Sequence, residues 1–203
     1  MSYDQIDFPK GEFKALIFDL DGTLVDSMPA HFQAWCAALE DHGAPGIFGE
    51  DVFYAMGGRP TKDIVKELNG ELNRSLDPDA VSASKRMAFL EILDQIDIIE
   101  PVVNFAKEHH GKVPLAVATG GTRKIATLTL EKAGILDLFD TIVTADDVEC
   151  GKPDPEVFLK AAERIGVDPK DCVAFEDAAP GIMAAQTAGM KVVSVPTPIK
   201  ILS

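Results

Sequence analysis

Short apolar segments alternate with amphipathic stretches along most of the chain, and this alternation predicts strands and helices in turn. Five segments rich in β-branched or aromatic residues predict strands: 14–19, 113–119, 141–145, 172–176 and 191–195. Three stretches of helical spacing lie between the later strands, and a glycine follows each: 122–133, 156–165 and 180–188. The strands are apolar along almost their whole length, which indicates a parallel sheet that helices bury on both faces.

One long interval lacks the strand pattern. Residues 28–98 contain helix signals but no convincing strand. Pro29 opens one expected helix, Gly70 ends a second, and Asp77 begins a third that reaches Ile96. The interval therefore predicts an all-helical insertion after the first strand.

The expected fold class is α/β, with a Rossmann-like three-layer parallel sheet as its core. Residues 1–27 and 99–203 form this core domain, and residues 28–98 form the inserted helical domain. Residues 101–112 are the expected helix that returns the chain to the sheet. A chain of 203 residues has room for one domain with such an insertion.

The composition excludes several classes of protein. With 46% apolar and 26% charged residues the chain can bury a core, which excludes a disordered protein. Its apolar runs are short against the roughly 20 residues that cross a bilayer, so we expect no membrane partner. The first ten residues lack an apolar stretch, so we expect no secretory signal. A formal net charge of −14 repels nucleic-acid phosphates, so we expect no nucleic-acid partner.

The cysteines point to a reducing compartment. Cys36, Cys150 and Cys172 lie far apart, and no two of them form a CxxC pair. We therefore expect a reduced, cytoplasmic protein with buried thiols.

Two carboxylates follow the first predicted strand, in the sequence Asp19-Leu20-Asp21-Gly22. An unpaired charge is costly to bury, so carboxylates at the end of a buried strand need a reason. Residues i and i+2 of a strand project to one side with Cα atoms about 6–7 Å apart. One carboxylate can then attack a substrate while the other handles the proton of the leaving group. The alternative is an ordinary Asp-Gly turn.

Glu176 and Asp177 end another predicted strand. The carboxyl ends of parallel strands meet at one edge of the sheet, where open α/β sheets bind their ligands. Carboxylates gathered there repel one another unless a cation lies among them, and oxygen ligands with open water positions suit Mg²⁺. The alternative is that both acids only cap the following helix.

Two further segments suit phosphate binding. Thr119 closes the second predicted strand and Gly120-Gly121-Thr122 follow, so hydroxyl and backbone N–H groups are available at a helix start. Lys152 lies in the proline-stiffened sequence Gly-Lys-Pro-Asp-Pro, where its charge can neutralise carboxylates and a phosphate. Taken singly, these segments are an N-cap and a solvated lysine. Together with two acidic strand ends they indicate a phosphate site.

With these four motifs in this order, the sequence resembles the haloacid dehalogenase superfamily of phosphohydrolases. The resemblance covers about residues 13–195. It implies that the first strand lies between the strand that ends at Thr119 and the strand that ends at Glu176. That strand order brings all four motifs to one edge of the sheet.

The resemblance also implies roles for the motif residues. Asp19 is the nucleophile that forms an aspartyl-phosphate, and Asp21 protonates the leaving alkoxide and then deprotonates the attacking water. Thr119 and Lys152 bind the transferring phosphoryl group. The implied ligands of a Mg²⁺ cofactor are Asp19, the backbone carbonyl of Asp21, Asp177 and, directly or indirectly, Glu176.

The helical insertion is similar to the family's small cap. Residues 26–35 resemble the branch that contains β-phosphoglucomutase and bacterial fructose-1-phosphate phosphatases. Such a cap closes over the active site and excludes water. His31, Lys85 and Arg59 are then candidate substrate contacts, with Gly120 beside the phosphate. The alternatives are a packed helix face for His31 and a solvated side chain for Lys85.

The implied partner is a small phosphorylated metabolite, a hexose phosphate, on which a monomer acts. Mutases of this branch place a Ser-Lys pair where this chain has Gly121 and Thr122, which weakens a site for a second phosphate and favours a phosphatase over a phosphosugar mutase. The alternative is that Arg123 or Lys124 takes the place of that pair. A phosphosugar-binding regulator without turnover is another alternative. A receiver-type signalling module has its phosphoacceptor on a middle strand of a shorter chain, so the motif order argues against this class. A dinucleotide-binding enzyme needs GxGxxG after the first strand, and Gly22-Thr23-Leu24 does not supply it.

Overall fold

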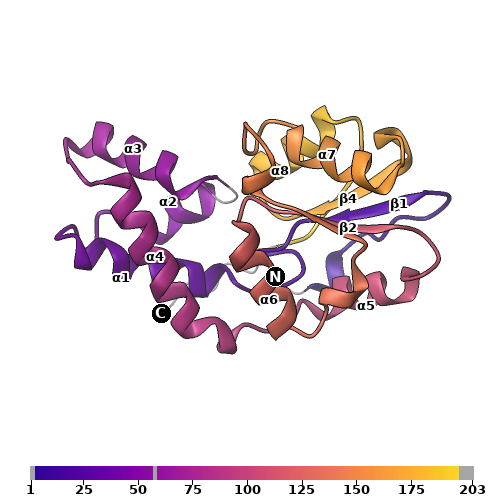
Figure 1. The fold of residues 1–203 in the computed structure, drawn as a ribbon, viewed down its shortest axis with the longest axis horizontal. Coiled ribbons are helices and arrows are strands. Elements are labelled where there is room, and N and C mark those ends of the chain that lie inside the picture. The colour runs from indigo at the N-terminus through magenta and orange to yellow at the C-terminus, as the bar shows by residue number, and fades with distance from the viewer. Residues whose placement is uncertain (1–2, 57–58, 197–203) are drawn as a thin grey trace.

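The computed structural model describes residues 3–56 and 59–196. Its centre is a five-stranded parallel sheet in the order β3-β2-β1-β4-β5. Figure 1 labels three of these strands, β1, β2 and β4. The strands are β1 (Ala15–Phe18), β2 (Leu115–Ala118), β3 (Thr141–Val143), β4 (Cys172–Glu176) and β5 (Lys191–Ser194). Each strand lies within a predicted segment, and β1 lies between β2 and β4, as the family resemblance implied.

Helices cover both faces of the sheet and complete three layers (Figure 1). One face carries α5 (Glu100–His109) and α6 (Arg123–Lys132), and the other carries α7 (Glu156–Ile165) and α8 (Ala179–Thr187). Leu16 and Phe18 pack against the first pair, and Ala15 and Ile17 pack against the second, because successive side chains of a strand point to opposite faces. The predicted α/β fold class is confirmed.

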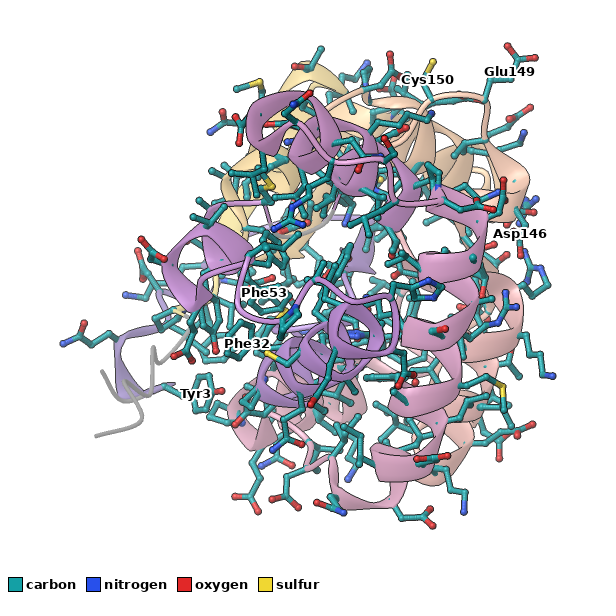
Figure 2. The ribbon with its side chains drawn as sticks, turned by 90° about the vertical axis from the view of Figure 1, so that its left-hand side faces the viewer. Tyr3, Phe32, Phe53, Asp146, Glu149 and Cys150 are labelled. Atoms are coloured by element: carbon teal, nitrogen blue, oxygen red, sulfur yellow. The ribbon has the colours of Figure 1, made fainter. Side chains whose placement is uncertain are left out.

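Four further helices lie beside the sheet (Figure 1). They are α1 (Met28–Asp41), α2 (Glu50–Ala55), α3 (Thr61–Leu72) and α4 (Pro78–Ile92). They enclose a hydrophobic cluster of their own around Trp35, whose ring centroid lies 5.0 Å from that of Phe48. Phe32 of α1 and Phe53 of α2, labelled in Figure 2, belong to the same cluster with centroids 5.4 Å apart.

Two backbone hydrogen bonds join the chain where it leaves the sheet layer and where it returns. Asp26 N–H donates to the Asp97 carbonyl, and Ile99 N–H donates to the Leu24 carbonyl, each over 2.9 Å. The passages out of and back to the sheet therefore lie side by side.

The prediction that Gly70 ends the second helix is wrong. The helix α3 continues to Leu72, and Asn73 follows it in the left-handed conformation with φ 49°. A glycine inside a helix costs only about 1 kcal/mol relative to alanine, so packing outweighs it. The amide side chain of Asn69 also bonds both the N–H and the carbonyl of Leu76, which fixes the turn after the helix.

The third helix is shorter than predicted, and one helix was not predicted at all. The helix α4 ends at Ile92, and a 3-10 turn over Leu93–Gln95 places Ile96 outside it. Leu93, the first residue of this turn, is buried in a cluster with Phe89 and Ala34. The helix α2 was not predicted, because its six residues make less than two helical turns and so show no helical periodicity in the sequence.

The expectation of buried thiols holds only for Cys172. Cys36 and Cys150 are exposed, and all three cysteines are free. Cys36 follows the buried Trp35 but points from the outer side of α1, and Cys150 lies in the loop at the molecular edge seen in Figure 2. Among the described residues, every helix is too short or too polar to cross a membrane.

The Asp147 carboxylate links the loop after β3 to a helix on each face of the sheet. Asp147 accepts hydrogen bonds from Arg123 at the start of α6 over 2.5 Å and from Arg164 at the end of α7 over 2.7 Å. It also accepts from the N–H and hydroxyl of Thr144. Burial works to raise the pKa of Asp147, but Arg164, Thr144 and Arg123 together hold it well below its ordinary value.

We expect Asp147→Asn to lower the free energy of unfolding by about 2 kcal/mol at pH 7, because charge-assisted hydrogen bonds are lost. A group with a lowered pKa stabilises the fold above its unfolded pKa, so the difference from the wild type should shrink as the pH falls below about 4. Urea unfolding at several pH values measures this.

Asp94→Asn is the matched control for Asp147→Asn. Asp94 pairs with Lys132 over 2.6 Å, but its side chain is 76% exposed, so the change should be within about 0.5 kcal/mol. Equal losses in the two variants would contradict a structural role for the Asp147 network.

Candidate active site

The carboxyl ends of β1, β2 and β4 bring the four predicted motifs together. Asp19 follows β1, Thr119 follows β2 and Glu176 ends β4. Phe18, the last residue of β1, pairs with Val117 on one side and with Phe175 on the other, so the three strand ends are level. The residues after them therefore lie at one edge of the sheet.

The ammonium group of Lys152 lies between two buried carboxylates. Its Nζ is 2.5 Å from Asp19 Oδ1 and 2.7 Å from Glu176 Oε1. Exposed fractions are 6% for Asp19, 2% for Lys152 and 1% for Glu176. Burial alone would lower the pKa of Lys152, but Asp19 and Glu176 raise it above its ordinary value, so the lysine is charged.

Two glycines make room for the carboxylates. A Cβ on Gly181 in α8 would lie 1.5 Å from Glu176 Oε1, and a Cβ on Gly22 would lie 2.3 Å from Asp177 Oδ2. Gly22 also has φ +84°, which other residues rarely adopt. The sequence pattern marks Gly22 only as a turn residue and gives no role to Gly181, because a close approach between distant segments leaves no local signal.

The site can hold a divalent cation. Asp19, Glu176 and Asp177 each offer a carboxylate oxygen, and these three atoms lie within 4.8 Å of one another. Burial raises the pKa of Asp19 well above its ordinary value, opposed by Lys152, and the carboxylates of Glu176, Asp177 and Asp21 raise it further. This acidic cluster is short of positive charge, and its oxygen ligands suit Mg²⁺. The Asp21 carboxylate lies outside the cluster of three.

Asp21 is instead held by the start of the helical segment. Its Oδ1 accepts a hydrogen bond from Ser27 Oγ over 2.6 Å and lies 3.0 Å from His31 Nε2. Although burial opposes the shift, His31, Ser27 and Lys85 lower the pKa of Asp21 to about 2. The His31 ring stacks on Phe89 with centroids 4.0 Å apart. Ser27 was not predicted as a site residue, because it also fits the start of a helix.

The loop after β2 lies beside this cluster. Thr119 is buried, and its Oγ1 accepts a hydrogen bond from Gly121 N–H over 3.0 Å. The Gly121 carbonyl accepts a hydrogen bond from Ala145 N–H, which connects this loop to the segment after β3. Thr119 and the predicted phosphate neighbour Gly120 both line the cavity described next.

A cavity of about 420 Å³ lies between the sheet edge and the helical segment. From the sheet edge it is lined by Asp19, Asp21, Thr119, Gly120, Glu176 and Asp177, and from the helical segment by His31, Trp35, Phe53, Arg59, Lys85 and Phe89, among others. All three predicted substrate contacts, His31, Arg59 and Lys85, are thus at the cavity. The neighbours of Arg59, Gly57 and Gly58, lie outside the described residues.

The two predicted cationic substrate contacts, Lys85 and Arg59, differ in their partners. Lys85 Nζ lies 5.4 Å from the centre of the Trp35 ring, and burial lowers its pKa to about 8. The Arg59 guanidinium lies 2.6 Å from Glu67 Oε2. Glu67 was not predicted at the site, because nothing in its helical position distinguishes it from a solvated acid.

Comparison with known proteins places this arrangement in a family. Residues 13–189 match the haloacid dehalogenase-like hydrolase family. The chain belongs to this family of hydrolases.

Two relatives confirm the predicted branch of the family. The chain is 41% identical over 186 residues to fructose-1-phosphate phosphatase YqaB of Escherichia coli, covering 90% of this chain and 96% of the relative. It is 34% identical to β-phosphoglucomutase of Bacillus subtilis over 195 residues, covering 90% of this chain and 83% of the relative. A solved hydrolase from Pseudomonas syringae has a TM-score of 0.80 and 29% identity, covering 88% of this chain and 83% of that one. The family and its phosphatase-named member confirm the predicted enzyme class, a phosphatase.

We expect Gly181→Ala to reduce the catalytic efficiency toward a phosphate monoester by about 100-fold, because the new Cβ displaces the Glu176 carboxylate and misplaces Lys152. Steady-state phosphate release measures the loss, and circular dichroism checks the fold.

Gly70→Ala makes the same change in α3, where a Cβ meets nothing within 4 Å. This control should keep full activity and gain about 0.5–1 kcal/mol of stability, since alanine favours the helix. Full activity of Gly181→Ala would show that the position of Glu176 does not matter for turnover.

Proposed function

We propose that the protein is a Mg²⁺-dependent phosphatase that hydrolyses a small sugar phosphate through an aspartyl-phosphate on Asp19. The observation that carries the proposal is the buried contact of Asp19, Lys152 and Glu176 at the floor of a cavity with room for a small metabolite. The names of the relatives, a fructose-1-phosphate phosphatase and a β-phosphoglucomutase, support a phosphorylated sugar as substrate.

In the proposed first step a carboxylate oxygen of Asp19 attacks phosphorus. An Asp19–phosphorus bond forms and the bond from phosphorus to the sugar oxygen breaks, with Asp21 giving its proton to the leaving alkoxide. In the second step Asp21 takes a proton from water, whose oxygen attacks phosphorus and releases inorganic phosphate and free Asp19. The pKa of about 2 keeps Asp21 ionised in the free enzyme. The negative charge of a phosphate bound beside it would raise this pKa and so favour the protonated form that is needed as an acid.

The other residues of the sheet edge position and neutralise the phosphoryl group. Lys152 supplies a fixed charge, and Thr119 and Gly120 supply the loop at the helix start. Asp19, Asp177, the backbone carbonyl of Asp21 and, directly or indirectly, Glu176 would hold Mg²⁺, which supplies positive charge that offsets the equatorial phosphate oxygens.

We infer that residues 28–98 act as a cap over this site. Helices from this segment form one side of the cavity, and His31, Lys85 and Arg59 reach it from there. These side chains are then the contacts to the sugar portion, a hexose in our proposal. We further expect a monomer in the cytoplasm, where the three free cysteines stay reduced.

The first test is phosphate release from fructose 1-phosphate, 6-phosphogluconate and β-glucose 1-phosphate, with Mg²⁺ and with a chelator. We expect metal-dependent release from at least one of them and no glucose 6-phosphate from β-glucose 1-phosphate. Formation of glucose 6-phosphate without net release would identify a mutase. Tight binding without turnover would identify a phosphosugar-binding regulator.

A second test addresses the nucleophile. We expect Asp19→Asn to lower kcat at least about 1,000-fold while the protein stays folded, because the amide oxygen is a poor nucleophile and the Mg²⁺ site loses a charge. Phosphate release measures kcat, and rapid acid quenching of the wild type with a radiolabelled phosphate should trap label on the protein. Label trapped on the Asp19→Asn variant would contradict the assignment.

A further inference from the structure

We propose that Glu67 sets the charge selectivity of the cavity by neutralising Arg59, so that the site accepts monophosphates with an uncharged remainder and rejects a second anionic group. The inference rests on the proposed function and concerns the cavity wall formed by the start of α3. This wall lies on the helical side of the cavity, across from the carboxylate cluster.

The cations of this wall are already paired with acids of the helical segment. Three of them line the cavity: Arg59, Lys62 and Lys66. Arg59 pairs with Glu67 over 2.6 Å, Lys66 with Asp63 over 3.0 Å, and Lys62 with Asp79. Each positive charge is matched by one negative charge, so the wall presents donors without net charge.

The Arg59–Glu67 pair is the one that matters most for selectivity. Its side chains are 29% and 35% exposed, whereas those of the two lysine pairs are between 51% and 76% exposed. Screening by water is weaker at the less exposed pair. A guanidinium is also the group that binds phosphate in a bidentate manner, so an unpaired Arg59 would be a second phosphate site.

Glu67 prevents this second site without removing the hydrogen-bond donors. The bond to Glu67 runs from one guanidinium nitrogen, Nη2, of Arg59. A guanidinium has five N–H donors, so others stay available to hydroxyl oxygens of an uncharged sugar. The wall therefore suits a polyol chain.

Two further cations of the helical segment line the cavity, Lys85 and the exposed Arg86, both in α4. Lys85 has no carboxylate within ion-pair distance among the described residues, and its charge helps to lower the pKa of Asp21. The helical side of the cavity also contributes apolar lining from Trp35, Phe53 and Phe89. A phosphate at the sheet edge meets the charges of Lys152 and Lys85, whereas each cation at the start of α3 is already paired with an acid. A second phosphate there would stay uncompensated or would have to displace Glu67.

The test compares one sugar with one or two phosphates, fructose 1-phosphate and fructose 1,6-bisphosphate. The wild type should prefer the monophosphate. In Glu67→Gln the ratio of kcat/KM for the bisphosphate to that for the monophosphate should rise about fivefold, the effect of one half-exposed charge interaction. In the double variant Arg59→Gln/Glu67→Gln the gain should disappear. Glu71→Gln, one turn further along α3 and exposed, is the matched control and should leave the ratio unchanged.

An unchanged ratio in Glu67→Gln, or a gain that survives in the double variant, would overturn the inference. Calorimetry in the Asp19→Asn background gives the matching ratio of Kd values for the bisphosphate and the monophosphate, and this measurement needs no turnover. Absence of turnover by the wild type would therefore count against the proposed function alone, while the Kd ratio still decides the role of Glu67.

Discussion

The site depends on the ammonium group of Lys152, which is buried between the carboxylates of Asp19 and Glu176. With no solvent to screen them, these charges are compensated chiefly by one another, and removing one partner of a buried pair typically costs about 3–5 kcal/mol. Three segments far apart in the sequence must therefore meet: the ends of β1 and β4 and the loop before α7. The strand order satisfies this requirement, because β1 and β4 are neighbours in the sheet.

Crowding is the second constraint at this edge. Four carboxylates and an ammonium group lie close together here, and two of the carboxylates lie against backbone of neighbouring segments. A side chain approaches the backbone this closely only where the backbone residue has no Cβ. Gly181 leaves room for Glu176 and Gly22 for Asp177. Burial, charge pairing and backbone approach are thus linked at Glu176, since moving this acid would also loosen its ion pair with Lys152.

Much of this arrangement could be predicted from the sequence, for a physical reason. The end of a strand can be recognised from the local sequence, and the carboxyl ends of parallel strands lie at one edge of the sheet. The acids after β1 and β4 could therefore be expected to lie close together. The helical segment was predicted less well, because a glycine at position 70 does not by itself end α3, and the bonds of the Asn69 side chain to Leu76 that fix the following turn leave no pattern in the sequence. Ser27 and Glu67 were not predicted, because the hydrogen bond from Ser27 to Asp21 and the ion pair of Glu67 with Arg59 leave no periodic pattern in the sequence.

Charge balance explains how a protein with a net charge of −14 can offer a site for an anion. Among the described residues at the reacting end, Asp19, Asp21, Glu176 and Asp177 contribute four negative charges and Lys152 and Lys85 two positive ones, which leaves −2. A divalent cation at the cluster of three carboxylates would bring this sum to zero, so a phosphate could enter without net repulsion. The start of α3, where each cation has its own acid, adds nothing to this balance. Local electrostatics then favour one phosphate at the sheet edge and a neutral group against the helices.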